Sequence, residues 1–316
     1  MLKIMKTIFG SHLYGLDTPE SDTDYKGIYL PTLDELLLNS YKPYINLDTT
    51  KKGKNTADDV DMEWIALPTF ITMACKGETI ALDMLHSDVA ETYPEFGYIW
   101  SAIQRDRSRF YTKGLKSYAG YLKGQVIKYG KKGKKLIAIQ EALDAVQDIT
   151  DETRLGHVWY RLKANEFNKF VNIDEQDFFN VCGSKFQKQI TVGYFKSQLI
   201  KMRKGYGARA LKAEAAGGYD WKAVSHSLRA GYQLMEIYKE GVFHYPLAKT
   251  DFIKQVKNGE IDYETVVEPE LNRILAAIAV LVEKSKYLER VDNDFWDDWI
   301  IDIYEDVFNL HGDYND

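Results

Sequence analysis

Two short stretches near the amino terminus decide the fold, FGSHLYG at residues 9–15 and SDTDYKG at residues 21–27. Residues 22–30 alternate in polarity and are rich in Tyr and Ile, so they predict a β-strand. Asp22 and Asp24 lie two residues apart on it, and their carboxylates therefore point the same way. Two like charges held together are costly unless a cation lies between them. The spacing indicates a metal site.

The residues around this pair favour phosphate chemistry. Gly10 and Ser11 form a turn in which backbone N–H groups can approach a phosphate closely, and the Ser hydroxyl adds a donor. Residues 59–65 alternate again and predict a second strand, with Asp61 and Glu63 on one face. Either carboxylate would complete a two-metal clamp for in-line phosphoryl transfer. A D-x-D pair alone is often an exposed turn, so the order of all three motifs carries the inference.

This order resembles the nucleotidyltransferase superfamily typified by DNA polymerase beta. The fuller string G-S-x-x-Y-G…S-D-x-D-x-K-G is more similar to its YcgL/RlaP branch, whose bacterial and phage members are predicted nucleotidyltransferases linked to RNA repair. The similarity extends over most of the chain, through residues 59–88, 115–135 and 219–247. Residues 76–79, KGET, depart from it, because the branch has an Asn-Pro-like turn there. Residues 145–200 match no motif of the branch.

The resemblance implies a metal-dependent mechanism. Asp22 and Asp24 would hold two Mg²⁺ ions, for which Mn²⁺ could substitute. A third carboxylate would hold the ion that activates the acceptor hydroxyl. Asp61 aligns with the Asp of the family, although strand geometry also permits Glu63. These four carboxylates are the expected catalytic residues.

The resemblance also implies contacts to the nucleotide. The residues expected to make them are Gly10, Ser11, Lys26, Lys222, His226 and Arg229. The spacing of the last three puts them on one face of a helix, where three cations repel one another unless an anion binds. The spacing leaves an alternative open, in which this face pairs with the acidic segment 292–316.

Composition excludes several classes of protein. The chain has 316 residues, 45% of them hydrophobic, which is enough to build cores and argues against general disorder. It contains no apolar run long enough for a membrane span, and its start lacks the pattern of a signal peptide. Two cysteines in unrelated contexts argue against a disulfide framework and fit a reducing compartment. We therefore expect a cytoplasmic protein with no membrane partner, and the resemblance implies a bacterium or the host of a phage.

The net charge of −6 is unevenly distributed. Residues 105–135 hold eleven Lys and Arg against one acid, and residues 185–212 hold eight and no acid. Residues 291–316 hold nine acids and no Lys or Arg. Charge runs are usually solvated helix faces, but clustered cations are also typical of polyanion-binding surfaces. We expect the two basic segments to contact RNA.

The sequence predicts an α+β protein of two domains. Residues 1–105 would form a polymerase beta-like nucleotidyltransferase domain, a small mixed sheet with helices. Residues 106–316 would form a helical domain that contacts acceptor and nucleotide. Periodicity of 3.6 residues predicts helices at 112–128, 135–147, 158–171, 185–202, 221–239 and 268–288.

The expected activity is transfer of NMP from an NTP such as ATP to an acceptor hydroxyl, with release of pyrophosphate. The favoured acceptor is the 3′ end of an RNA, with tRNA as one candidate. Two alternatives remain open at this point. The acceptor could be a protein hydroxyl, or the chain could be a catalytically silent module that binds nucleotide or RNA.

Overall fold

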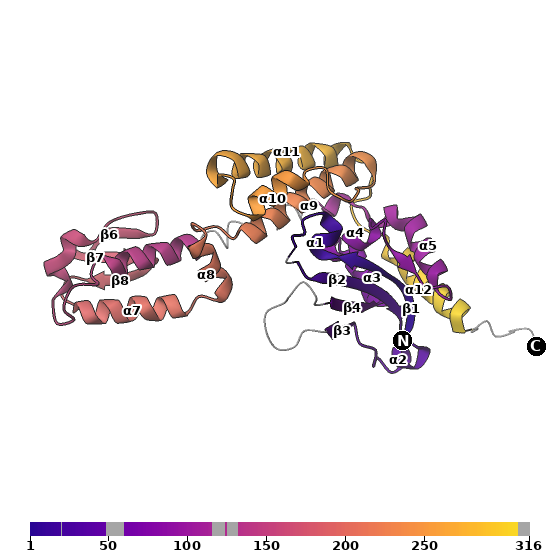
Figure 1. Ribbon diagram of the computed structural model, residues 1–316, viewed down its shortest axis with the longest axis horizontal. Coiled ribbons are helices and arrows are strands. Elements are labelled where there is room, and N and C mark those ends of the chain that lie inside the picture. Colours follow the sequence, from indigo (N-terminus) through magenta and orange to yellow (C-terminus); the bar gives the residue numbers. More distant parts are fainter. Residues whose placement is uncertain (20, 49–59, 116–123, 125–131, 309–316) are drawn as a thin grey trace, which may run out of the picture. The chain divides into compact units, whose positions relative to one another are not determined.

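The computed structural model describes residues 1–19, 21–48, 60–115, 124 and 132–308 (Figure 1). The chain is mixed α+β, as expected, and forms two compact units. Unit 1 comprises Met1–Gly120, Leu228–Gln255 and Tyr263–Asp316, and unit 2 comprises Tyr121–Ser227 and Val256–Asp262. This division by contacts differs from the functional division expected at residue 105, which stays a prediction.

A five-stranded sheet with the order β3-β4-β2-β1-β5 organises unit 1. Its strands are β1 (Leu2–Phe9), β2 (Thr23–Leu30), β3 (Tyr44–Asp48), β4 (Val60–Ala66) and β5 (Glu91–Thr92). β2 and β4 are parallel and the other neighbours are antiparallel, so the sheet is mixed. The strands expected from alternation at residues 22–30 and 59–65 are thus confirmed within the described residues. Pro31 follows directly after β2, as the sequence predicts.

Several helices pack against this sheet (Figure 1). α3 packs on β2 and β4, α5 on β1, and α12 on α3. Pro68 lies in the first turn of α3, and Gly77 follows its end with a φ of +67°, as the start and stop signals predict. The helices and helical turns that lie within unit 1 are α1 (Gly10–Tyr14), α2 (Leu33–Leu37), α3 (Leu67–Cys75), α4 (Thr79–Leu85), α5 (Gly97–Asp106), η1 (Arg107–Phe110), η2 (Lys113–Leu115), η4 (Tyr263–Val267), α11 (Glu268–Lys284) and α12 (Asn293–Phe308).

Unit 2 contains a second, three-stranded antiparallel sheet, made of β6 (Asn168–Ile173), β7 (Gln176–Val181) and β8 (Ser184–Gln187). Helix α7 (Val192–Lys204) follows it, then α8 (Ala208–Ala215). Residues 132–144 are helical and η3 (Leu155–Arg161) is a 3₁₀ segment. A core that includes Phe179, Phe186 and Phe195 joins the sheet to α7. Two helices cross between the units: α9 (Trp221–Glu240) begins in unit 2, and α10 (Thr250–Lys257) ends there.

The helix predictions had mixed success. α9, α11 and the helical residues 132–144 confirm three of them. The helix expected at 158–171 is wrong, because this segment forms η3 and then enters β6. The helix expected at 185–202 is wrong in its first part, which is β8. Most of the helix expected at 112–128 lies outside the described residues, as does the loop expected at 49–58.

Within the described ranges, no helix combines the length and the apolar character needed to cross a bilayer.

Candidate metal and nucleotide site

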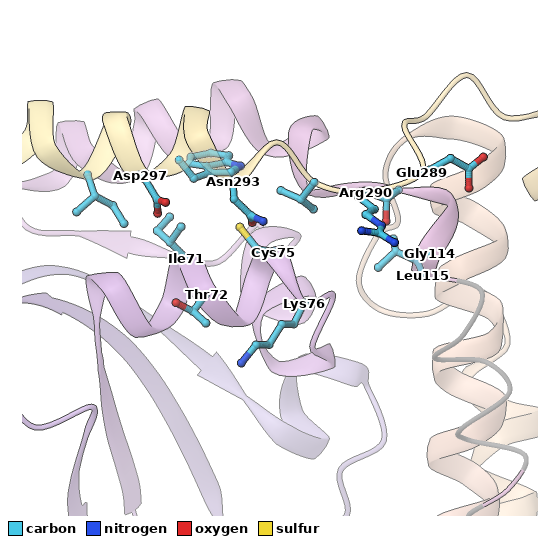
Figure 2. Close-up of a pocket in the computed structure, with 14 residues that line it drawn as sticks. Ile71, Thr72, Cys75, Lys76, Gly114, Leu115, Glu289, Arg290, Asn293 and Asp297 are labelled. Carbon is cyan, nitrogen blue, oxygen red and sulfur yellow. The ribbon is translucent and has the colours of Figure 1, made fainter.

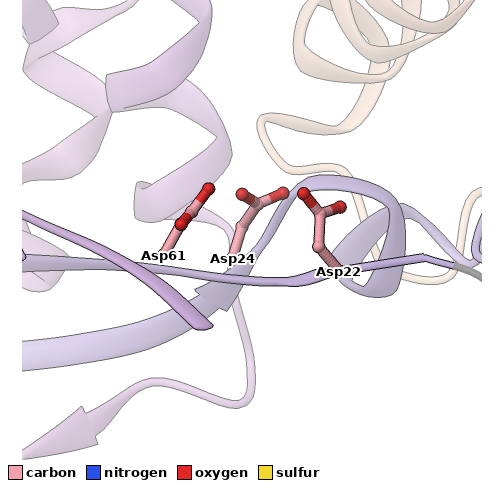
Figure 3. Close-up of side chains that lie close together, drawn as sticks. All are labelled: Asp22, Asp24 and Asp61. Atoms are coloured by element: carbon pink, nitrogen blue, oxygen red, sulfur yellow. The ribbon is translucent and has the colours of Figure 1, made fainter. Parts of the chain in front are cut away.

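Three carboxylates meet at one end of the central strands of unit 1. Asp24 of β2 lies opposite Asp61 of β4 in the parallel pairing, and Asp22 directly precedes β2. Figure 3 shows the three side chains rising from the same side of the strands. One carboxylate oxygen from each lies within 4.8 Å of the others, and all three residues are partly buried. The arrangement is what hard divalent cations such as Mg²⁺ prefer.

The order of the strands explains why these residues meet. β2 lies between β4 and β1, so its side chains have neighbours from both strands. β1 pairs with β2 such that Phe9 lies opposite Asp24, and Gly10 therefore follows beside the carboxylate. Gly10 has a φ of +63°, and a Cβ placed there would lie 2.1 Å from Asp24 Oδ2. Glycine is required at this position both by the backbone conformation and by the close approach of the carboxylate.

Glu63 lies one step along the same face and has a different partner. It is opposite Lys26 in the pairing of β4 with β2, and the Lys26 ammonium lies 2.5 Å from Glu63 Oε2. The ammonium also lies 5.1 Å from the centre of the Phe9 ring. Glu63 is therefore engaged in an ion pair beside the cluster, while Asp61 belongs to the cluster itself. A contact from Lys26 to phosphate stays a prediction, and it would require this pair to open.

Arg229 lies in the core rather than on an exposed face of α9. It is 5% exposed and donates to both carboxylate oxygens of Asp83, at 2.9 and 2.8 Å. Its guanidinium lies over the ring of Tyr14, 3.9 Å from the ring centre. The Tyr14 hydroxyl donates to the same carboxylate, 2.7 Å from Asp83 Oδ2. The anion that Arg229 requires is thus supplied by the protein.

This buried network joins three elements of unit 1. Tyr14 ends α1, which carries Gly10 and Ser11, whereas Asp83 is in α4 and Arg229 in α9. Burial and the Asp83 carboxylate together raise the pKa of Tyr14, so its hydroxyl keeps its proton and donates. Burial alone would lower the pKa of Arg229, but Asp83, Tyr14 and Tyr245 together raise it above its ordinary value. The network therefore fixes the position of α1, whose first two residues are Gly10 and Ser11.

Sequence reasoning had missed Asp83 and Tyr14. A signal for Asp83 was present, because it stands alone in the apolar run ALDML at residues 81–85, and an acid buried in such a run needs a partner. Tyr14 belongs to the G-S-x-x-Y-G string itself. The structure shows that the first motif, the ALDML run and the carboxyl-terminal motif are joined through these two residues and Arg229.

The other two members of the expected cationic helix face are exposed. Lys222 and His226 belong to the part of α9 that lies in unit 2. They therefore belong to a different unit from the carboxylate cluster and Arg229. Their contact with nucleotide phosphate stays a prediction.

Unit 1 also contains a cavity of about 590 Å³, lined by residues of α3, of the 112–115 segment and of the 289–300 segment (Figure 2). Charges of both signs line it, including Lys76 and Arg290 against Glu289 and Asp297. Burial, with a smaller effect of Asp297, raises the pKa of the Cys75 thiol to about 11. The thiol is thus protonated near neutral pH and is a poor nucleophile. The lining shares no residue with the carboxylate cluster.

Comparisons with known proteins agree with the geometry. A family model described as RNA repair pathway DNA polymerase beta family, RlaP, matches residues 4–302. A 38.9 kDa protein of the nrdC-mobD intergenic region of Enterobacteria phage T4 is 38% identical over 331 residues, covering 96% of this chain and 97% of the relative.

A solved structure, of a nucleotidyltransferase-like protein from Exiguobacterium sibiricum 255-15, matches over 90% of this chain and 69% of the other. Its sequence identity is 7% and the TM-score is 0.25, too low to carry an argument about the fold. The family model and the phage relative each span nearly the whole chain and confirm the resemblance found in the motifs. The chain therefore belongs to the RlaP family, the RNA repair pathway DNA polymerase beta family, and is a nucleotidyltransferase.

Proposed function

We propose that the protein transfers NMP from an NTP to the 3′ hydroxyl of an RNA, with tRNA among the candidate acceptors, and releases pyrophosphate. The observation that carries this proposal is the cluster of Asp22, Asp24 and Asp61, whose carboxylate oxygens lie within 4.8 Å of one another. Such a cluster is costly without a cation and fits a phosphoryl-transfer centre.

The chemistry of the cluster fits two Mg²⁺ ions, or Mn²⁺ in their place. The three ligand groups are all carboxylates, which both ions accept, and substrate phosphates would supply further oxygens. Asp22 and Asp24 would hold both ions, and Asp61 would complete the site next to the acceptor hydroxyl. Bound there, the ions would supply Lewis-acid stabilisation of the charge on the transferring phosphoryl group. The ion pair of Glu63 with Lys26 favours Asp61 over Glu63 as the third ligand.

The remaining site residues have proposed roles in binding. Gly10 and Ser11 would contact the triphosphate, because the turn lies directly beside Asp24. Lys222 and His226 would contact phosphate of nucleotide or RNA. Arg229 was expected to contact the nucleotide, but its burial and its hydrogen bonds to Asp83 support a positioning role through Tyr14.

The distribution of charge supports an RNA acceptor. Unit 2 has 20 Lys and Arg against 13 Asp and Glu, a net charge of +7, and unit 1 therefore has a net charge of −13. Polyanion binding depends on such local excess of cations rather than on the net charge of the whole chain. The basic segment at residues 185–212 lies entirely in unit 2. The segment at residues 105–135 lies partly outside the described residues.

The test is incubation of the full chain with each labelled NTP, Mg²⁺ and RNA, with the Asp24→Asn variant as control. We expect label on the RNA 3′ end and none with the variant. Label on protein but never on RNA would replace the RNA acceptor with a protein hydroxyl. Binding of nucleotide and RNA without any transfer would make the chain a silent binding module.

A further inference from the structure

An open groove lies on unit 2, between the edge of its sheet and α7. Its volume is about 360 Å³, and its walls come from β7, β8 and α7. Six of its lining residues carry the argument, and they are Lys185, Phe186, Gln187, Tyr194, Gln198 and Met202. All lie within unit 2, so the groove is complete without unit 1.

The lining combines an apolar floor with polar and aromatic edges. Phe186 is 5% exposed and forms part of the core, whereas Tyr194 is 53% exposed. Tyr194, Gln198 and Met202 follow one another at intervals of four residues, so they share one face of α7. Among the described residues, neither the Tyr194 hydroxyl nor the Gln198 amide has a hydrogen-bond partner, which leaves both available to a ligand. A flat, aromatic ligand with polar edges matches this surface.

Positive charge surrounds the groove. Residues 178–213 include eight Lys and Arg and no acid. Lys188, Lys196 and Arg203 are neutralised by ion pairs with carboxylates. Within the described part of the chain, Lys185 and Lys201 have no such pair. Lys201 is three residues after Gln198, so it lies near the same face of α7. Lys185 lines the groove, so at least one of these cations lies beside it.

Another cavity on unit 2 provides a contrast. It has a volume of about 720 Å³ and is lined in part by Tyr160, which is 79% exposed. Two carboxylates, from Glu141 and Asp144, also line it, together with Arg161 and Lys163, so its lining has no surplus of positive charge. Its carboxylates would repel phosphate, so this larger cavity is the poorer site for a nucleic acid. The lining of the smaller groove has an exposed aromatic side chain and a lysine, and it contains no carboxylate.

We propose that the groove binds one unpaired base of a single-stranded RNA, the acceptor of the proposed function, on which this inference rests. The base stacks on Tyr194 above the apolar floor, and its polar edge reaches the Gln198 amide. Lys185 and Lys201 contact the flanking phosphates. The cations alone would also attract an acidic peptide, but such a peptide offers nothing for the aromatic and apolar surface. A duplex presents no free base to the groove.

The proposal can be tested with a fluorescein-labelled oligouridylate. Its binding to the full chain is measured by fluorescence anisotropy across a series of salt concentrations. Tyr194→Ala should weaken binding about tenfold, because a stacked base is lost. Tyr194→Phe keeps the ring and should bind within about twofold of the wild type. Lys185→Gln should weaken binding and make the slope of log K against log salt shallower by about 0.7. Tyr160→Ala is the matched control and should change nothing.

The outcomes separate this proposal from the proposed function. If the wild type binds neither oligouridylate nor any other RNA, the RNA acceptor is wrong and the groove with it. If the wild type binds RNA but Tyr194→Ala binds equally well, the groove is wrong and the RNA acceptor stands. Equal affinity for an RNA duplex, or full competition by polyglutamate, would also overturn the base site. All four variants alter exposed side chains, so matching melting temperatures should accompany the changes in affinity.

Discussion

The charged side chains of unit 1 and unit 2 differ in how the fold uses them. Unit 1 buries an ion pair between Asp83 and Arg229 and gathers three carboxylates at one end of β2 and β4. Unit 2 has a surplus of Lys and Arg and a groove with no lining acid. Repulsion among carboxylates would be relieved by a metal ion, whereas a surplus of lysines would be relieved by a polyanion. The net charge of −6 for the whole chain therefore hides two units of opposite charge.

The largest expected effect concerns Asp24, whose carboxylate belongs to the cluster of unit 1. Asp24→Asn should lower turnover about a thousandfold or more, since metal-ion catalysis contributes several kcal/mol. The same change removes one of three mutually repelling charges, so the metal-free protein should become more stable. Kinetics with Mg²⁺ and thermal melting in EDTA measure the two effects. A lower melting temperature of the variant in EDTA would contradict the assignment of the cluster.

The buried ion pair gives the next largest effect. Arg229→Met removes the cation that pairs with the buried Asp83 carboxylate, which keeps hydrogen bonds from neutral donors alone, and should lower the free energy of unfolding by about 3 kcal/mol. Arg203→Met of unit 2 breaks a half-buried pair with Glu214, and Arg273→Met breaks an exposed pair with Glu270. Both should cost about 1 kcal/mol or less. Urea unfolding of the three variants measures their free energies of unfolding and so ranks the three losses. Equal losses would show that burial does not decide the strength of these pairs.

Acid should destabilise unit 1 through His86. Burial lowers the pKa of His86 to about 4, while its ring is held between the Leu82 carbonyl and the Tyr111 hydroxyl. The unfolded chain takes up this proton near pH 6.5, so stability is full above that pH and falls as pH decreases toward 4. The loss should be about 3 kcal/mol. Urea unfolding at several pH values should show this slope in the wild type and lack it in His86→Gln. An unchanged slope in the variant would remove His86 as the cause.

The smallest effect compares two glycines with positive φ, one in each unit. Gly10→Ala would place a Cβ 2.1 Å from Asp24 Oδ2, whereas Gly183→Ala would meet nothing within 4 Å. Both changes strain the backbone by about 1–2 kcal/mol. Gly10→Ala alone should displace a proposed metal ligand and lower turnover about a hundredfold. Steady-state kinetics at saturating Mg²⁺ measure the difference. Normal turnover of Gly10→Ala would show that Gly10 is not needed to position the Asp24 carboxylate.

The strands that carry the cluster were predictable, and those of unit 2 were not. The first halves of β2 and β4 alternate in polarity, and Pro31 follows directly after β2. The β6–β7 and β7–β8 turns are two residues long, Asp174-Glu175 and Cys182-Gly183, and all four residues have positive φ. Such turns usually contain Asn-Gly or Asp-Gly. The sequence Asp-Glu gives almost no turn signal, so the apolar residues nearby matched a helical period instead.

The candidate site was predictable as a list of residues but only partly as an arrangement. Two-residue spacing places Asp22 with Asp24, and the structure confirms that Asp61 joins them. Spacing on a helix could not show that Arg229 turns into the core, because the partner that draws it there, Asp83, is 146 residues away in sequence. Pairing at such a distance depends on the tertiary fold.

The register of β2 against β4 has a consequence for how the gene can change in length. One residue added or removed inside either strand would turn Asp24 or Asp61 to the opposite face, since side chains alternate along a strand. Length changes between Leu30 and Tyr44 would leave that register intact, because β2 pairs directly with β4. An alignment of homologous genes should therefore collect its gaps in the connection and keep both strands free of them.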